Sequence, residues 1–436
     1  MKPATQHHSL ECPLRPEALT RIAVLALVTS LASFGSVTVH AQSQWTPART
    51  YPPTTSFQKV AFGNGRFVAT ASAAGLPVVL TSRDGLAWSD PLPAPAESDF
   101  DLHLKFVRDR FFLFQQEGVW TSTEGAAWTR FNLPQGFGPL GITHDGSRYV
   151  VVGEDAAGGG GSAFATSTNG LDWVVSSFHI FRFTFRDVAA FTNAETGWEG
   201  WRKTIAVTGA YNAKFSGDQG YILNLPRDEV GWWLMPATLA ASAGGSQVAA
   251  LHSISVDPYG TFVVAGDSNL GPFLGRLEEF YTGSDSRILS SWTRFDSRIL
   301  SLAHGNGLFL ALSGRTVLTS VDGVGWSREG TLPFDADSAA IAGGDGIFVV
   351  VAGNTAFYST HDGRPRLGSL SNYGRWGSCE CLSAVGLPGH TVAIESSVDL
   401  KEWHQVAFSI SGRVDFENRD SSIWQWPRRF YRATQR

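Results

Sequence analysis

The sequence predicts an all-β protein, a seven-bladed β-propeller followed by a small C-terminal β module. Three observations predict this fold. A pattern of two apolar runs around a turn recurs seven times, a second pattern containing Ser, Gly and Trp recurs between those copies, and both patterns stop near residue 366. The composition agrees with a turn-rich β protein, because only 17% of the 436 residues are charged while 47 are Gly and 15 are Trp.

The first 41 residues resemble an export signal. Arg21 precedes an apolar run at residues 22–34, and the small residue Ala41 follows as the expected last residue before cleavage. The run is too short for a comfortable membrane span. A buried N-terminal strand or helix is the alternative. Cleavage after Ala41 leaves residues 42–436, which we expect to be secreted, periplasmic or held at the cell surface without membrane insertion.

The net charge of −5 is spread along the chain without long acidic or basic runs. Nucleic acid is therefore not an expected partner, because binding it usually requires a basic face. Cys379 and Cys381 are two apart, so a strand would place both side chains on one face. We favour two buried thiols and leave a disulfide open. No Cys/His cluster has the spacing of a metal site, and we expect no metal, no cofactor and a monomer.

The first pattern, here called the paired apolar repeat, is clearest in "KVAFGNGRFVATA" at residues 59–71. Two apolar runs around a Gly, Asn or Asp turn predict a β-hairpin. The seven copies align at Phe67, Phe111, Tyr149, Ile205, Phe262, Phe309 and Phe348. These positions are 38 to 57 residues apart, which suits four-stranded propeller blades with insertions in the middle ones.

The second pattern, here called the turn motif, has the form Ser-x-acid-Gly-x-x-Trp, as in "SRDGLAW" at residues 82–88. The acidic position is occupied by Asp84, Glu124, Asn169, Asp322 and Asp362. We expect a type I′ turn at the acid and Gly, with the acid accepting hydrogen bonds from turn amides. The Trp should pack between neighbouring blades. Because Asn169 could not serve as a general acid or nucleophile, the position is predicted to be structural.

The last blade has no predicted outer strand, because Pro365 occupies the place where that strand would start. A Trp-Thr pair without a preceding hairpin, Trp45 and Thr46, stands near the start of the mature chain. We therefore expect residues 43–48 to lie beside residues 355–360. This pairing would close the ring and remove two open sheet edges.

With these repeats, residues 45–366 resemble the Asp-box (BNR) repeats of the sialidase-like β-propeller superfamily, although the turn motif has one residue fewer between acid and Trp. A sialidase-type active site would imply an arginine triad, a Tyr–Glu pair and an acid/base Asp. The family's Phe-Arg-Ile-Pro signature is missing; the nearest string, at residues 181–187, lacks the Pro. We therefore predict no catalytic residues and a non-enzymatic module that binds or scaffolds a glycan or protein. The alternative is a sialidase-type exo-glycoside hydrolase.

An insertion in the fourth repeat, residues 193–201, carries Trp198 and Trp201. Tryptophans near a loop tip often mark contact with a sugar or protein, so these two are the candidate ligand-binding residues. Their alternative role is to fold back on the blade.

Residues 367–436 lack both patterns and resemble a small β-sandwich-like module that ends many secreted bacterial proteins. Ser397, Asp399 and Trp403 reproduce the spacing of the turn motif, but Leu400 replaces its Gly. The sequence thus predicts three parts, namely the signal at 1–41, the propeller at 42–366 and the module at 367–436.

Overall fold

The computed structural model describes residues 45–435, with internal gaps. The gaps are at residues 97–101, 116–117, 156–160, 178–182, 193–202, 214–216, 226–232, 240–245, 259, 278–286, 290, 336–337, 361–365, 370–379, 387–389, 411 and 419–429. Every regular element of the described part is a β-strand, which confirms the all-β prediction. No helix in that part could cross a membrane. Residues 42–436 form one compact unit, and the predicted signal lies outside the described residues.

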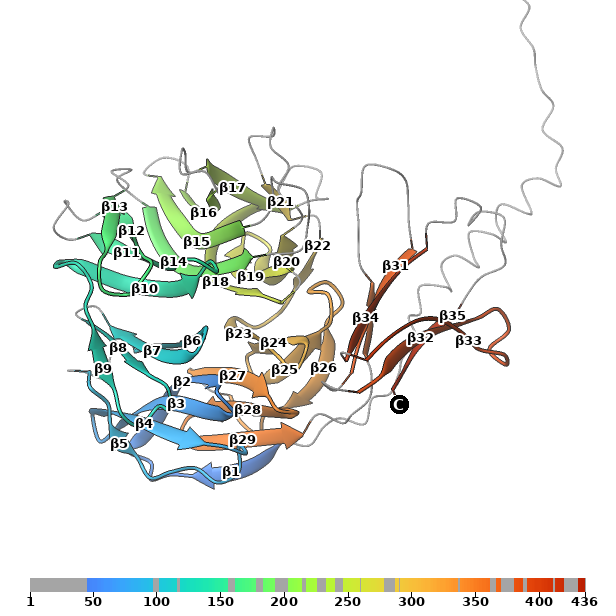
Figure 1. Cartoon of the computed structure of the whole chain (residues 1–436), viewed down its shortest axis with the longest axis horizontal. Helices are drawn as coiled ribbons and strands as arrows, with labels where there is room; N and C mark the ends of the chain where they lie inside the picture. The colour runs from blue at the N-terminus through green and yellow to red at the C-terminus, as the bar shows by residue number, and fades with distance from the viewer. Residues whose placement is uncertain are drawn as a thin grey trace, which may run out of the picture. The chain divides into compact units, whose positions relative to one another are not determined.

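Most strands belong to antiparallel sheets of four, built from neighbours in sequence (Figure 1). The first sheet contains β2 (Thr55–Gly63), β3 (Arg66–Ala73), β4 (Leu76–Ser82) and β5 (Leu92–Pro93). The second contains β6 (His103–Val107), β7 (Arg110–Gln115), β8 (Gly118–Ser122) and β9 (Thr129–Phe131). The third contains β10 (Phe137–His144), β11 (Tyr149–Asp155), β12 (Gly161–Ser167) and β13 (Val174–Ser177).

The middle of the chain forms a longer, nine-stranded sheet. Its first half contains β14 (Phe183–Thr192), β15 (Lys203–Ala213), β16 (Gly217–Leu225) and β17 (Trp233–Leu239). Its second half contains β18 (Ser246–Val256), β19 (Phe262–Ser268), β20 (Gly271–Leu277) and β22 (Ser291–Arg294), and β21 (Arg287–Leu289) pairs in parallel with β17. The two halves are joined by a short antiparallel pairing between β17 and β18. Each half therefore corresponds to one copy of the sequence repeat, although the two form a single sheet.

Two further four-stranded sheets complete the repeated part. One contains β23 (Ile299–Gly305), β24 (Leu308–Ser313), β25 (Thr316–Ser320) and β26 (Ser327–Thr331). The other contains β27 (Ala339–Gly344), β28 (Ile347–Ala352), β29 (Thr355–Thr360) and β1 (Thr46–Thr50), in the order β27-β28-β29-β1.

The first strands of successive sheets contact one another in a closed series. β2 contacts β6, β6 contacts β10, and the series continues through β14, β18, β23 and β27, which in turn contacts β2. The aligned aromatic of each paired apolar repeat is buried in every copy whose side chain is described, from Phe67 to Phe348. These rings pack between sheets because each sheet is covered on both faces, which explains the continuous apolar runs in the sequence.

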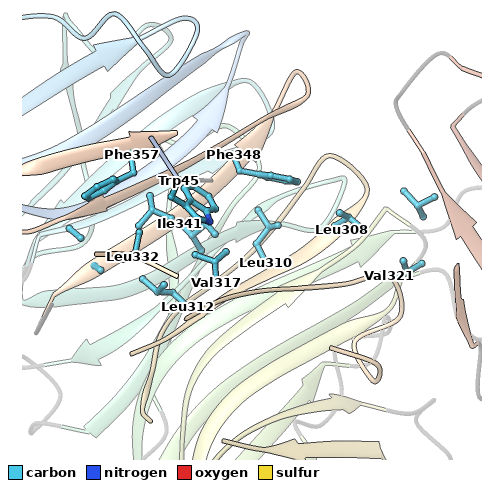
Figure 2. Close-up of a cluster of buried hydrophobic side chains, with 14 residues drawn as sticks. Trp45, Leu308, Leu310, Leu312, Val317, Val321, Leu332, Ile341, Phe348 and Phe357 are labelled. Carbon is cyan, nitrogen blue, oxygen red and sulfur yellow. The ribbon is translucent and has the colours of Figure 1, made fainter. Parts of the chain in front are cut away.

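The predicted pairing of the N-terminal segment with the last repeat is confirmed. β1 is antiparallel to β29, with Thr46 opposite Tyr358 and Thr50 opposite Thr355. Trp45, just before the strand, is 7% exposed and belongs to an apolar cluster with Phe348, Phe357 and residues of β24 (Figure 2). The N-terminal strand is therefore attached to the last sheet of the repeated part by both backbone pairing and a buried ring.

The C-terminal residues form two three-stranded sheets that share one apolar core. One contains β30 (Arg366–Ser369), β31 (Glu380–Val385) and β34 (Arg413–Asn418), and the other contains β32 (Val392–Ser397), β33 (His404–Ser409) and β35 (Phe430–Gln435). Their shared cluster contains Ala384, Val392, Ile394 and Val414. Cys379 lies outside the described residues, and the side chain of Cys381 in β31 is likewise not described, so the predicted pair of thiols stays a prediction.

Buried ion pairs attach these C-terminal sheets to the repeated part. Arg413 Nη1 lies 3.0 Å from Asp257 Oδ2, and both side chains are at most 6% exposed. Arg366 Nη2 lies 2.9 Å from Glu329 Oε2, with Glu329 buried and the Arg366 side chain 10% exposed. Removing one partner of such a pair leaves an uncompensated buried charge, which costs far more than the pair itself contributes.

His304 lies beside the Arg413–Asp257 pair and is held neutral. Its Nε2 atom is buried without a hydrogen-bond partner among the described residues, and its ring packs edge-on against Phe309 at 5.2 Å. Burial lowers the pKa of His304 to about 4, Asp257 opposes that shift, and Arg413 adds to it. Protonation of this ring would place a third charge beside the buried ion pair.

We expect Trp45→Ala to lower the free energy of unfolding by about 3–5 kcal/mol, because it removes a buried ring and leaves a cavity. The urea midpoint of a chain of residues 42–436 measures this loss. Pro47→Ala changes an exposed residue of the same strand and should cost less than about 1 kcal/mol. Equal midpoints for W45A and P47A would contradict the packing role of Trp45.

We expect the free energy of unfolding to decrease as the pH is lowered from about 6.5 to 4. Over this range His304 becomes protonated in the unfolded chain but stays neutral in the folded chain. The pKa difference corresponds to roughly 3 kcal/mol. His304 lies opposite Phe309, and the equivalent positions of the first two sheets are occupied by Phe62 and Phe106. The H304F variant should therefore fold, and its stability should lose the pH dependence that His304 contributes. The exposed His390→Gln variant is the control. A slope unchanged in H304F would refute the assignment.

Candidate functional site

The acid of the turn motif is a turn cap. In the copy at Asp84, Oδ1 accepts the amides of Leu86 and Ala87 at 2.9 and 2.8 Å and the hydroxyl of Ser82 at 3.2 Å. The amide of Ala87, ahead of the other donors, lowers the pKa of Asp84. The carboxylate is therefore held ionised, whereas a general acid needs a raised pKa.

Other described copies of the turn motif repeat this bonding with one variation. Asn169 Oδ1 accepts the amides of Leu171 and Asp172 at 2.8 and 2.9 Å, and Asp322 does the same for its turn at 2.9 Å. The Glu124 copy differs: Ser122 Oγ accepts the amide of Glu124 at 3.2 Å as well as that of Gly125, and the longer side chain of Glu124 reaches Arg66 at 3.6 Å. Asp362 lies outside the described residues. The side-chain oxygen thus caps the turn at Asp84, Asn169 and Asp322, whereas the Glu124 carboxylate pairs with Arg66.

The predicted type I′ turn is wrong for the turn motif. At Asp84, Glu124, Asn169 and Asp322 the acid or amide has a negative φ, and only the Gly that follows is in the left-handed region. Two consecutive positive φ values occur instead in the paired apolar repeats, as at Asn64–Gly65 and Asn306–Gly307. Bonds from the acid to the following amides form an Asx-type loop, which replaces the two-residue hairpin turn.

The Gly of the turn motif is required for two reasons. Besides its positive φ, it lies against the preceding sheet: a Cβ at Gly85 would lie 2.8 Å from Val349, and one at Gly125 would overlap Val68. The same relation holds for Gly170 with Phe131 and for Gly323 with Val263. Gly85 of the first sheet thus contacts the sheet that contains β1. The close approach of glycine to the preceding sheet is therefore also found between the first and last sheets.

The Trp of the turn motif completes the contact between sheets. Trp88 Nε1 donates to Gly85 O at 2.9 Å, and the ring belongs to a cluster that includes Val349 and Val351 of β28. Trp128 repeats the bond to Gly125 O at 3.2 Å. The predicted packing of these rings between sheets is confirmed.

One edge of the sheets, here called the turn face, carries the turns of both patterns. Neighbouring turns are bonded to each other along it: Asn306 Oδ1 accepts the amide of Gly346 at 2.9 Å. Asn64 Nδ2 donates to Asp109 O at 2.8 Å and to Thr123 O at 3.1 Å. The turn face is therefore a continuous surface that joins several sheets.

Two open hollows lie in the turn face at the first three sheets. The hollow here called the Arg108 hollow has a volume of about 400 Å³ and is lined by Phe106, Val107, Arg108, Thr143, His144 and Gly146. The second, here called the Arg83 hollow, has a volume of about 320 Å³ and is lined by Arg66, Thr81, Ser82, Arg83, Asp84 and Ala87. The C-terminal sheets contact this face elsewhere, at Asp257 and Gly307.

A buried polar cluster lies on the first strands of the sheets. Lys105 Nζ pairs with Asp187 Oδ1 and donates to Val188 O at 3.1 Å. Asp187 Oδ2 accepts the amide of Ile254 at 3.2 Å and the hydroxyl of Ser253 at 3.3 Å. Asp187 is 8% exposed, and its oxygens are occupied by donors from three strands. This arrangement ties β6, β14 and β18 together, as expected of a structural ion pair.

The residues predicted to bind ligand are not placed. Trp198 and Trp201 lie outside the described residues, so their role stays a prediction. The structure instead draws attention to Arg108 and Lys105, which the sequence patterns had not singled out. The sequence does distinguish Arg108, because it stands at a turn position where other repeats have Asn or Asp.

No family model matches the chain, and no curated protein matches it either. A solved structure of virginiamycin B lyase from Staphylococcus aureus is similar over 72% of this chain and 97% of its own, with a TM-score of 0.50 and 9% identity. The chain therefore has a β-propeller fold. The Dos1 propeller is also similar, over 73% of this chain and 96% of its own, with a TM-score of 0.44 and 8% identity. At such identities the similarity concerns the propeller fold and not an activity.

We expect Gly125→Ala to cost more stability than Gly75→Ala. Both residues have positive φ, but a Cβ at Gly75 meets nothing within 4 Å while one at Gly125 overlaps Val68 of the neighbouring sheet. The Gly75 variant should cost about 1 kcal/mol for its backbone alone, and the Gly125 variant at least 2 kcal/mol, because overpacking adds strain. Urea denaturation of both variants gives the difference. Equal losses of unfolding free energy in the two variants would mean that the positive φ alone requires glycine, and would contradict the role of sheet contact at Gly125.

Proposed function

We propose that this chain is a secreted, non-enzymatic, seven-bladed β-propeller of the Asp-box type that binds a glycan or protein, with a C-terminal β-sandwich-like module. The seven repeats, the closed series of first strands and the β1–β29 pairing support this blade count. The Asp-box assignment is supported by the bonding of Ser82, Asp84 and Gly85 and its recurrence in later sheets. We expect the mature propeller to work as a monomer outside the cytoplasm, without nucleic acid, metal or cofactor.

The observation that carries a non-enzymatic role is the use of the buried acids. Among the described residues, each buried carboxylate is held by a basic side chain or by turn amides. The pairs are Asp145 with Arg148, Asp187 with Lys105, Asp257 with Arg413, Glu329 with Arg366 and Glu395 with Arg432, while Asp322 caps its turn. Most glycosidases need two carboxyl groups that face a substrate, one of them with a raised pKa, and a sialidase-type site needs an acid/base Asp beside a Tyr–Glu pair.

Exposed acids with shifted pKa values point the same way. Backbone amides, that of Glu402 first, lower the pKa of Asp399, and the Arg110 side chain lowers that of Asp109. These groups stay ionised at neutral pH and accept hydrogen bonds. Their role is to fix turns, which supports a binding surface held by a rigid scaffold.

A glycan array together with a fluorogenic sialoside assay tests the proposal. We expect the mature chain to bind a ligand on the array and to leave the sialoside intact. Asp187→Asn probes the central acid, and Asp84→Asn is the matched control because Asn169 already caps a turn of this kind. Sialoside hydrolysis that D187N abolishes and D84N retains, with both variants folded by circular dichroism, would establish the hydrolase alternative.

A further inference from the structure

Arg108 adopts a backbone conformation that does not suit an arginine. It occupies the turn between β6 and β7 with a φ of 63°, where the corresponding turns place Asn64, Asn306 and Asp345 at φ values of 49°, 53° and 51°. Asn and Asp tolerate this region, whereas a longer side chain is strained there by about 1 kcal/mol. Strain kept at an exposed position suggests that the side chain has a use outside the fold.

The fold makes little use of the Arg108 guanidinium. The neighbouring carboxylate, Asp109, is bound by Arg110 at 3.3 Å, and Arg110 is the first cause of its lowered pKa. Asn64 secures the backbone of this turn by its bond to Asp109 O. Arg108 thus borders the Arg108 hollow as an exposed residue, and its charge is a lesser cause of the lowered pKa of Asp109 than Arg110.

The walls of the Arg108 hollow are held in place by the core. The Phe106 ring packs against Phe111 at 5.0 Å and fills the space in front of Gly63. The His144 ring lies edge-on to Tyr149 at 4.8 Å, and its Nδ1 accepts the amide of Gly146 at 2.9 Å. An arginine, two aromatic edges and the hydroxyl of Thr143 therefore surround one preformed, open depression.

The Arg83 hollow, one sheet away, shares an arginine and hydroxyl groups with the Arg108 hollow but has no aromatic lining residue. Arg83 is exposed at its border, while the adjacent Asp84 carboxylate is taken up by turn amides. Arg66 is bound to Glu124, and Arg148 to Asp145. Arg83 and Arg108 are left as two separate positive charges on a chain whose net charge is −5.

We propose that the two hollows bind an acidic polysaccharide, with the carboxylate of one sugar at Arg108 and that of another sugar along the polymer at Arg83. Shallow, adjacent depressions suit an extended polymer better than a small molecule, which needs an enclosed site. Arginine binds a carboxylate through two parallel N–H donors. This inference rests on the proposed glycan-binding function and names the ligand class for it.

Binding of polygalacturonate and of neutral dextran by the mature chain tests the proposal. We expect polygalacturonate to bind with an affinity that falls as salt rises, and dextran not to bind. Arg108→Gly should weaken binding at least tenfold and slightly raise the melting temperature, because it relieves the left-handed strain. Arg83→Ala should weaken binding by a similar factor. Arg298→Ala, an exposed arginine in the loop before β23, is the control of equal charge and should change neither quantity.

The outcomes separate the two proposals. Polygalacturonate binding that R108G and R83A leave equal to R298A would overturn the assignment to these hollows, and so would binding of dextran alone, while glycan binding itself would stand. Failure of both polymers here, and of every ligand on the glycan array, would remove glycan binding as a whole. Binding lost in R108G with a lowered melting temperature would assign Arg108 a structural role and also overturn the proposal.

Discussion

The pairing of β1 with β29 is the contact on which the proposed ring depends. The other four-stranded sheets are made from strands that follow each other in sequence, whereas this one joins residues about 300 positions apart. Without it, β29 would present an unpaired edge, and the cluster around Trp45 would lose its largest ring. A closed ring in turn gives the turn face its continuity, because neighbouring turns are bonded only when their sheets are side by side.

Close approach between sheets explains why the turn motif is so constant. Gly85 and its counterparts must reach positive φ and leave room for a Val or Phe of the preceding sheet, so glycine is kept while the acid varies. The acidic position needs only a side-chain oxygen that accepts two turn amides, and Asn169 supplies one as well as Asp322 does. The C-terminal sheets show the same bonding at Ser397 and Asp399, with Leu400 accepting a φ of 63° in place of glycine. The hydrogen bonding of the turn therefore does not require the glycine. The glycine is needed where the turn contacts a neighbouring sheet.

Much of the propeller could be predicted from the sequence because local patterns determine its sheets. The alignment of Phe67 with Phe348 gave the repeat, and the unpaired Trp45 gave the closing strand. The type I′ turn was mispredicted at Asp84 because side-chain bonding overrode the Asp-Gly preference. The buried pairs Lys105–Asp187 and Arg413–Asp257 join distant strands, so no local pattern reveals them. The hollows depend on how three sheets meet, which spacing alone does not encode.

Hydrogen exchange of β29 tests the closing contact most directly. A chain of residues 42–436 is compared with a chain that begins at Tyr51 and therefore lacks Trp45 and β1. We expect the amides of Thr355–Thr360 that face β1 to exchange at least tenfold faster in the shorter chain. Protection should also fall in β24 and β28, which share the Trp45 cluster. Unchanged protection of β29 in the shorter chain would contradict closure by the N-terminal strand.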